Sequence, residues 1–195
     1  MVKKISRIKA RTRRARLRGF LRWLCYSLVL LLFYLWEVAP LIRGWCPLLI
    51  IPLATAVAMF EGEFAAGVFG VFCGFMLDIA SGTLIGFSSL WLLTACPAIS
   101  LLGQFWLKRN WVTHLVMNTI TVILICGLDF LFLHWVWERE LSGISFMYSL
   151  LPAYLWAIAL SLPVYLLIRF ISMSFRPKEE RRLEEAVADS SDEEE

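Results

Sequence analysis

Hydrophobic residues run along this chain in six long blocks, separated by short polar or charged interruptions. The blocks cover roughly residues 20–42, 46–60, 64–80, 84–106, 111–137 and 146–172. A helix that crosses a membrane needs about 17–25 apolar residues, so most blocks are long enough to span, whereas the second is short. The pattern predicts an all-α polytopic membrane protein with six transmembrane helices.

The second and third blocks are separated only by Glu61, Gly62 and Glu63. So short a separation predicts a tight helical hairpin with a solvated turn. Prolines lie inside or near the ends of several blocks, which membrane helices tolerate when neighbouring groups satisfy the freed carbonyls. An alternative with five spans treats residues 46–80 as one re-entrant pair. It ranks below six spans because it would place the basic C-terminal flank outside.

The charged residues collect at the two ends of the chain. Hydrophobic residues make up 59% of the sequence, ten of the 19 basic residues precede residue 23, and nine of the 16 acidic residues follow residue 178. With six spans, seventeen basic residues fall on the side of the termini and two on the other, so both termini are expected in the cytoplasm. We therefore divide the chain into a basic arm (1–19), a transmembrane domain (20–172) and a charged tail expected to be disordered (173–195).

The basic arm has a regular pattern of its own. Basic residues recur at helical spacing, and one face carries Lys4, Arg7, Arg11, Arg14 and Arg18. Such a helix is expected to bind anionic lipids, at about 1 kcal/mol for each charge near the surface. A solvated tail that only sets the topology is the alternative. Nucleic-acid binding is not expected, because the arm is tethered to a bilayer and has no interleaved aromatic residues.

The sequence holds no recognisable catalytic or metal motif. The five cysteines show no CxxC spacing, and neither HExxH nor GxSxG occurs, so we expect no metal, no cofactor and no enzymatic activity. Asp78 and Asp129 lie in separate blocks and evoke an intramembrane aspartyl protease. Their flanks, MLDIAS and GLDFLF, lack the glycine-bounded loops of that chemistry.

The stretch GVFCGFMLDIASGTLIG, residues 70–86, places a carboxylate among glycines. Gly70, Gly74 and Asp78 are spaced i, i+4, i+8 and so share one face of the third helix. Glycines let a neighbouring helix approach closely. A carboxylate costs about 2.5–3.5 kcal/mol at the bilayer centre, so Asp78 is expected to face protein or a water-filled cavity rather than lipid. A turn and the close-packed start of the next helix are expected to follow, formed by Ser81, Gly82 and Gly86.

Other polar residues fall at a similar depth, toward the outer side. The predicted outer polar cluster consists of Glu37, Arg43, Asp129 and His134. Intramembrane carboxylates are functional candidates by default. Three interpretations remain open: structural pairing between helices, a surface that meets a partner, and a site for an ion or small molecule. His114, near the inner end of the fifth block, is expected to be an interfacial histidine with satisfied hydrogen bonds.

The glycine–aspartate stretch also carries a likeness to a known family. The pattern Gly70-x3-Gly74-x3-Asp78-x2-Ser81-Gly82-x3-Gly86 resembles the signature of the rod shape-determining protein MreD family. A proline at the start of the second block, an aspartate in the fifth and a late proline followed by a basic flank also fit. In this sequence they are Pro47, Asp129, and Pro163 to Arg169. The likeness covers about residues 45–170.

The resemblance implies a small protein of the bacterial inner membrane without known catalysis. Family members look like the substrate-binding S subunits of energy-coupling-factor vitamin transporters, so an S-component-like helical bundle is expected. The resemblance implies a place in the elongation machinery that makes side-wall peptidoglycan. The implied partners are a bitopic MreC-like protein and, further, the filament MreB, RodA and its transpeptidase. The leading hypothesis is a scaffold that docks its partner at the glycine–Asp78 hairpin. The alternative is a transporter subunit that holds a small ligand with Asp78 and Asp129.

Overall fold

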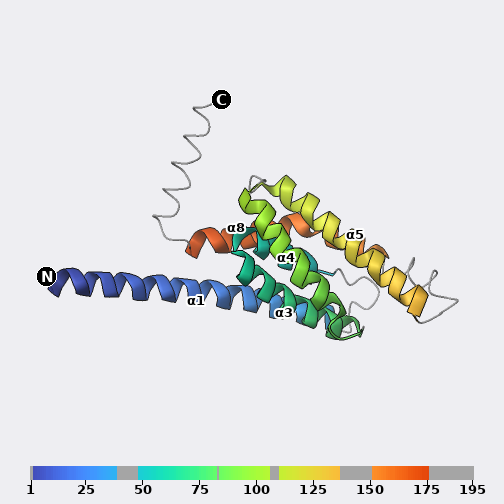
Figure 1. The fold of residues 1–195 in the computed structure, drawn as a ribbon, viewed down its shortest axis with the longest axis horizontal. Helices are drawn as coiled ribbons and strands as arrows, with labels where there is room; N and C mark the ends of the chain where they lie inside the picture. The colour runs from blue at the N-terminus through green and yellow to red at the C-terminus, as the bar shows by residue number, and fades with distance from the viewer. Residues whose placement is uncertain (1, 39–47, 83, 106–109, 137–150, 176–195) are drawn as a thin grey trace, which may run out of the picture. The chain divides into compact units, whose positions relative to one another are not determined.

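The computed structural model describes residues 2–38, 48–82, 84–105, 110–136 and 151–175 (Figure 1). The regular elements within these ranges are all α-helices, which confirms the predicted all-α class. They are α1 (Val2–Val38), α2 (Ile50–Phe60), α3 (Glu63–Ser81), α4 (Phe87–Phe105), α5 (Trp111–Val136), α7 (Leu151–Ala159) and α8 (Ser161–Phe175).

Within the described ranges, four helical segments are long and apolar enough to cross a membrane. They are Leu17–Val38, Glu63–Ser81, Phe87–Gln104 and Trp111–Leu131, and the pair α7 and α8 makes a fifth if it counts as one broken span. Helix α2 has 11 residues and is therefore about 16 Å long, shorter than a hydrocarbon core of about 30 Å. The chain thus has the helices of a membrane protein, but six complete spans are not confirmed.

The sixth predicted span is broken in two. We expected one helix over 146–172, but α7 ends at Ala159 and α8 begins at Ser161, with a bend of 43° between them. Pro163 accounts for the break, because it has no backbone N–H and its ring clashes with the carbonyl four residues earlier, at Ala159. The bend therefore follows from Pro163, a residue that can be identified in the sequence.

Residues 28–169 form one of two compact units, and α2 is its core. Every residue of α2 is buried, and the helix contacts α3, α4, α5 and α7. A helix that is apolar on all sides is typically buried in the core of a protein. The short second block is therefore enclosed by other helices, and the turn after it at Glu61 and Gly62 leads directly into α3, as predicted.

The second unit contains residues 1–27 and 170–195, described here for 2–27 and 170–175. Within it, the rings of Trp23 and Tyr26 meet edge to face, with centroids 5.7 Å apart. The predicted border between arm and membrane domain, after residue 19, falls inside the continuous helix α1. Arg18 is exposed. Outside the described residues lie the tail beyond 175 and the side chains of Lys4, Arg7, Arg11 and Arg14.

Candidate functional site

The glycine face of α3 packs against α4, and the two helices run side by side (Figure 1). A Cβ added at Gly74 would lie 2.4 Å from the Cα of Ser89, and one at Gly70 would lie 2.7 Å from the backbone oxygen of Leu92. Real Cβ atoms essentially never come within 3.0 Å of a heavy atom of a neighbouring element to which they are not bonded. The helix-packing role predicted for Gly70 and Gly74 is therefore confirmed, with α4 of the same chain as the neighbouring helix.

Asp78 is fully buried and bonds to the start of α4. Its Oδ2 accepts a hydrogen bond from the backbone N–H of Gly86 at 2.7 Å, and its Oδ1 accepts one from Ser88 at 3.1 Å. The first amides of a helix have no partner within the helix and carry the positive end of its dipole. The carboxylate on α3 therefore caps α4, so Asp78 faces protein, which is one of the two predicted surroundings.

The turn between the two helices depends on backbone conformation. Gly82 ends α3 with φ +66° and donates its N–H to the Asp78 carbonyl, and Gly86 has φ +99°. Both values lie in the region that favours glycine. A Cβ at Gly86 would meet no heavy atom within 4 Å, so the predicted close packing at this residue is wrong. Ser81, the last residue of α3, is exposed.

Glu37, from the predicted outer polar cluster, also lies near the start of a neighbouring helix. It lies near the end of α1, and its carboxyl group interacts with the backbone N–H groups of Leu49 and Ile50. Ile50 begins α2, so the carboxyl group of Glu37 lies at the N-terminus of a different helix. Two of the acidic residues within the apolar blocks thus lie at helix N-termini of this chain, and Asp78 makes hydrogen bonds there.

Asp129 has a partner on α7. The hydroxyl of Tyr154, which is buried, donates a hydrogen bond to Asp129 Oδ2. Asp129 also lies close enough to Asp78 for the two carboxyl groups to interact electrostatically. Arg43 and the side chain of His134 lie outside the described residues, so the predicted cluster of four is described only for Glu37 and Asp129, which meet different helices.

Replacing Tyr154 with phenylalanine is expected to destabilise the protein by about 1–2 kcal/mol. The change removes the hydroxyl and leaves Asp129 without this donor, and hydrogen bonds between membrane helices are worth roughly that much. Unfolding in mixed micelles with increasing denaturing detergent measures the loss. A double-mutant cycle with Asp129→Leu isolates the pair. A coupling energy near zero would show that the contact contributes nothing.

Two predictions for the inner side are wrong. Glu61 is buried rather than solvated, and its backbone oxygen accepts a hydrogen bond from Ser100 Oγ at 2.8 Å, whereas Glu63 is exposed as expected. His114 is 1% exposed and stacks on Tyr165, with ring centroids 4.9 Å apart. Neither of its ring nitrogens has a partner within hydrogen-bond geometry in the described part of the chain, so it is not the satisfied interfacial histidine we expected.

Sequence reasoning missed several residues of the site. A Cβ at Gly67 would lie 3.1 Å from Pro97 on α4, so the glycine face begins one turn before Gly70. Its spacing to Gly70 and Gly74 was a usable signal. The contact of Tyr154 with Asp129 had no such signal, because the two lie 25 residues apart on different helices.

Within the described ranges, no group of three or more histidine, cysteine, aspartate or glutamate side chains could hold a metal ion. Cys25, Cys73, Cys96 and Cys126 are free thiols. No family model, curated protein or solved structure matches this chain.

Proposed function

We propose that this protein is a non-enzymatic membrane scaffold of the bacterial machinery that synthesises side-wall peptidoglycan. Its place is the inner membrane, with both termini in the cytoplasm, where it holds a bitopic MreC-like partner. MreB, RodA and its transpeptidase are further members of the proposed complex. The proposal rests on the MreD-like pattern of residues 70–86 and on what those residues do in the fold.

One observation carries the proposal. The residues of the MreD-like pattern form a single structural device, in which Gly70 and Gly74 admit α4 and Asp78 caps it. These residues have structural roles in forming a helical hairpin, and such roles are what a scaffold requires. The transporter alternative needs Asp78 as a ligand-binding group, but both carboxylate oxygens already accept backbone N–H groups of α4. No observation favours that alternative.

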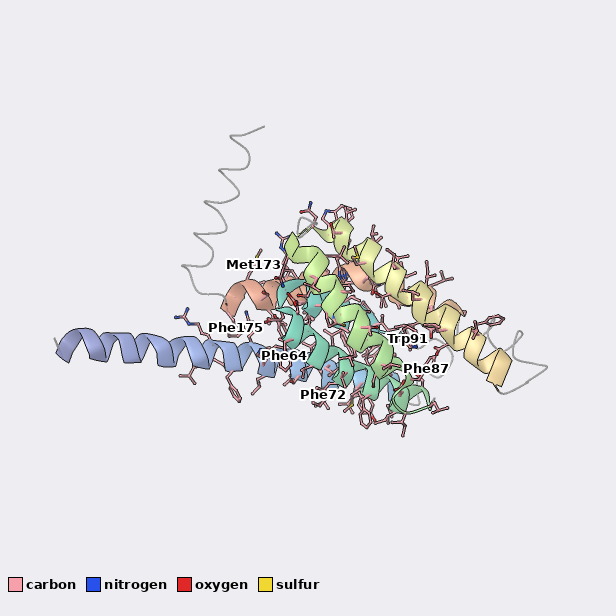
Figure 2. The ribbon with its side chains drawn as sticks, in the orientation of Figure 1. Phe64, Phe72, Phe87, Trp91, Met173 and Phe175 are labelled. Carbon is pink, nitrogen blue, oxygen red and sulfur yellow. The ribbon has the colours of Figure 1, made fainter. Side chains whose placement is uncertain are left out.

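The packing of α4 on the glycine face moves the proposed docking surface to the opposite side of α3. There an apolar stripe is exposed, made up of Phe64, Val68, Phe72, Phe75 and Ile79. Figure 2 labels two of its members, Phe64 and Phe72. Membrane helices associate through van der Waals packing, so this rigid stripe suits the single membrane helix of a bitopic protein. We call it the α3 outer stripe.

A photoreactive phenylalanine analogue at position 72 is expected to crosslink to the MreC-like partner in intact cells. Phe72 is 58% exposed on the α3 outer stripe. The matched control is the same analogue at Phe69, which is on the same helix but 5% exposed, and which should give only products within the chain. Immunoblots and mass spectrometry of the crosslinked bands identify the products.

The outcome discriminates between surfaces. Partner crosslinks at position 72 and none at position 69 support docking on the α3 outer stripe. Crosslinks only to lipid at position 72, in cells that make the partner, contradict it. Position 78, fully buried and bonded to α4, would be a poor probe of any partner.

A further inference from the structure

Unpartnered polar side chains lie deep inside the bundle where the broken helix pair meets α5. Asn118 and Ser161 are fully buried, and Asn118 Nδ2, Ser161 Oγ and both ring nitrogens of His114 have no hydrogen-bond partner among the described residues. A buried polar group without a partner costs about 1–3 kcal/mol, so four such atoms in one region call for an explanation.

These groups come from α5 and α8 and converge on the bend. His114 and Asn118 are one turn apart on α5, so they share a face. Ser161 is the first residue of α8, and the His114 ring lies close to the backbone of Ser161 and stacks on Tyr165, one turn further. His114 and Ser161 therefore meet at the bend that Pro163 causes, and Asn118 lies one turn further along α5.

A third helix closes the region. The Thr55 hydroxyl of α2 lies 3.1 Å from Asn118 Oδ1 and equally far from the Pro52 carbonyl, and the ring of Phe60 packs on Tyr165. Because Thr55 engages the oxygen of the Asn118 amide, the amide nitrogen is left to donate elsewhere. We call Asn118, His114 and Ser161 the bend triad.

The side chains of the bend triad offer hydrogen-bond donors and acceptors, but no fixed charge. The Asn118 amide offers two N–H donors, a neutral imidazole one donor and one acceptor, and a serine hydroxyl both functions. A metal ion or a small anion finds no carboxylate or fixed positive side chain among these three residues. The set matches a small uncharged molecule that both donates and accepts hydrogen bonds. Water satisfies buried polar groups in this way, with about three bonds each.

We propose that the bend triad is an internal hydration site, in which trapped water bridges α5 to the start of α8. Broken membrane helices are tolerated where side chains and ordered waters satisfy the freed backbone groups. At this bend, Pro163 frees the Ala159 carbonyl, so the water has a structural role. It holds α7 and α8 to the bundle at the point where Pro163 removes one bond from their backbone hydrogen-bond ladder.

Hydroxyl-radical labelling of the full-length protein by synchrotron X-rays tests the proposal, because radicals form from water next to a residue. His114 and Tyr165 should be oxidised despite their burial. Met59 is the control, because it is 2% exposed on α2 and methionine reacts readily. With buffer in heavy-oxygen water, the product at His114 should take up the isotope later than the product at Trp111, which is exposed on the same helix.

Two variants make the result decisive. Asn118→Leu keeps the branched shape of the side chain and removes a bridging group, so labelling of His114 should fall to the level of Met59 and the melting temperature should fall. Ser161→Ala should lower both to a smaller extent. Oxidation of His114 and Tyr165 no faster than Met59 in the unaltered protein would overturn the proposal. So would a rise in melting temperature in Asn118→Leu, because removing an amide nitrogen that has no partner stabilises a dry site.

Discussion

Replacing Gly74 with alanine is expected to lower the free energy of unfolding by about 3 kcal/mol, at the upper end of overpacking effects. The new Cβ would lie 2.4 Å from the Cα of Ser89 and 2.5 Å from its backbone nitrogen, so no side chain can move aside. The helices α3 and α4 would have to separate along their shared face, which loosens the largest helix–helix contact of the bundle.

Thiol labelling reports this separation directly. Cys73 on α3 and Cys96 on α4 are fully buried, so a variant that retains only these two cysteines should react slowly with a thiol dye. Gly74→Ala should raise the labelling rate at both. Gly103→Ala is the matched control, because a Cβ there meets nothing within 4 Å and alanine favours a helix over glycine by up to about 1 kcal/mol. Equal labelling in the two variants would mean that the close contact is not rigid.

Replacing Asp78 with alanine should destabilise the hairpin by about 2–4 kcal/mol. The change leaves the N–H groups of Gly86 and Ser88 without their acceptor, and each buried unsatisfied group costs about 1–3 kcal/mol. Asp78→Asn keeps one acceptor oxygen, so it should lose about half as much. Detergent-induced unfolding measures both variants.

The control for Asp78 is an acidic residue on the same helix that caps nothing in α4. Glu63 lies in the first turn of α3 and is exposed, so Glu63→Gln should change stability by less than about 1 kcal/mol. If Asp78→Ala were as stable as Glu63→Gln, the cap would have no energetic role. The carboxylate would then need another explanation, such as contact with a ligand or partner.

Much of the fold follows from the hydrophobic pattern. The blocks predict the helices because apolar runs of membrane length have few alternatives to a helix in lipid. The same pattern cannot distinguish a helix that crosses the membrane from one enclosed by other helices. It therefore predicts a short span for α2, although all residues of α2 are buried. The break at Leu160 could have been predicted from Pro163, but prolines elsewhere, such as Pro97, lie inside an unbroken helix.

The site was predictable where its parts are close in sequence. Gly70, Gly74 and Asp78 share a face by periodicity alone, and burial of the carboxylate followed from its desolvation. Periodicity does not determine how one helix is rotated against another. The hydrogen bonds that Asp78 accepts from the N–H groups of Gly86 and Ser88 could therefore not be derived from the sequence. The same limit applies to the pairs Thr55 with Asn118 and Tyr154 with Asp129, which lie on helices distant in sequence.

The cap that α3 places on α4 has a consequence for biogenesis. If α3 leaves the translocon without α4, the Asp78 carboxylate meets acyl chains. If the two helices leave together, the backbone N–H groups at the start of α4 already stabilise this carboxylate. Helices α3 and α4 are therefore expected to enter the bilayer as a pair, and α3 is expected to stay at the lateral gate of the translocon until α4 has been made. Ribosome pausing or a long insertion between residues 82 and 86 would expose the first helix to degradation before its companion arrives.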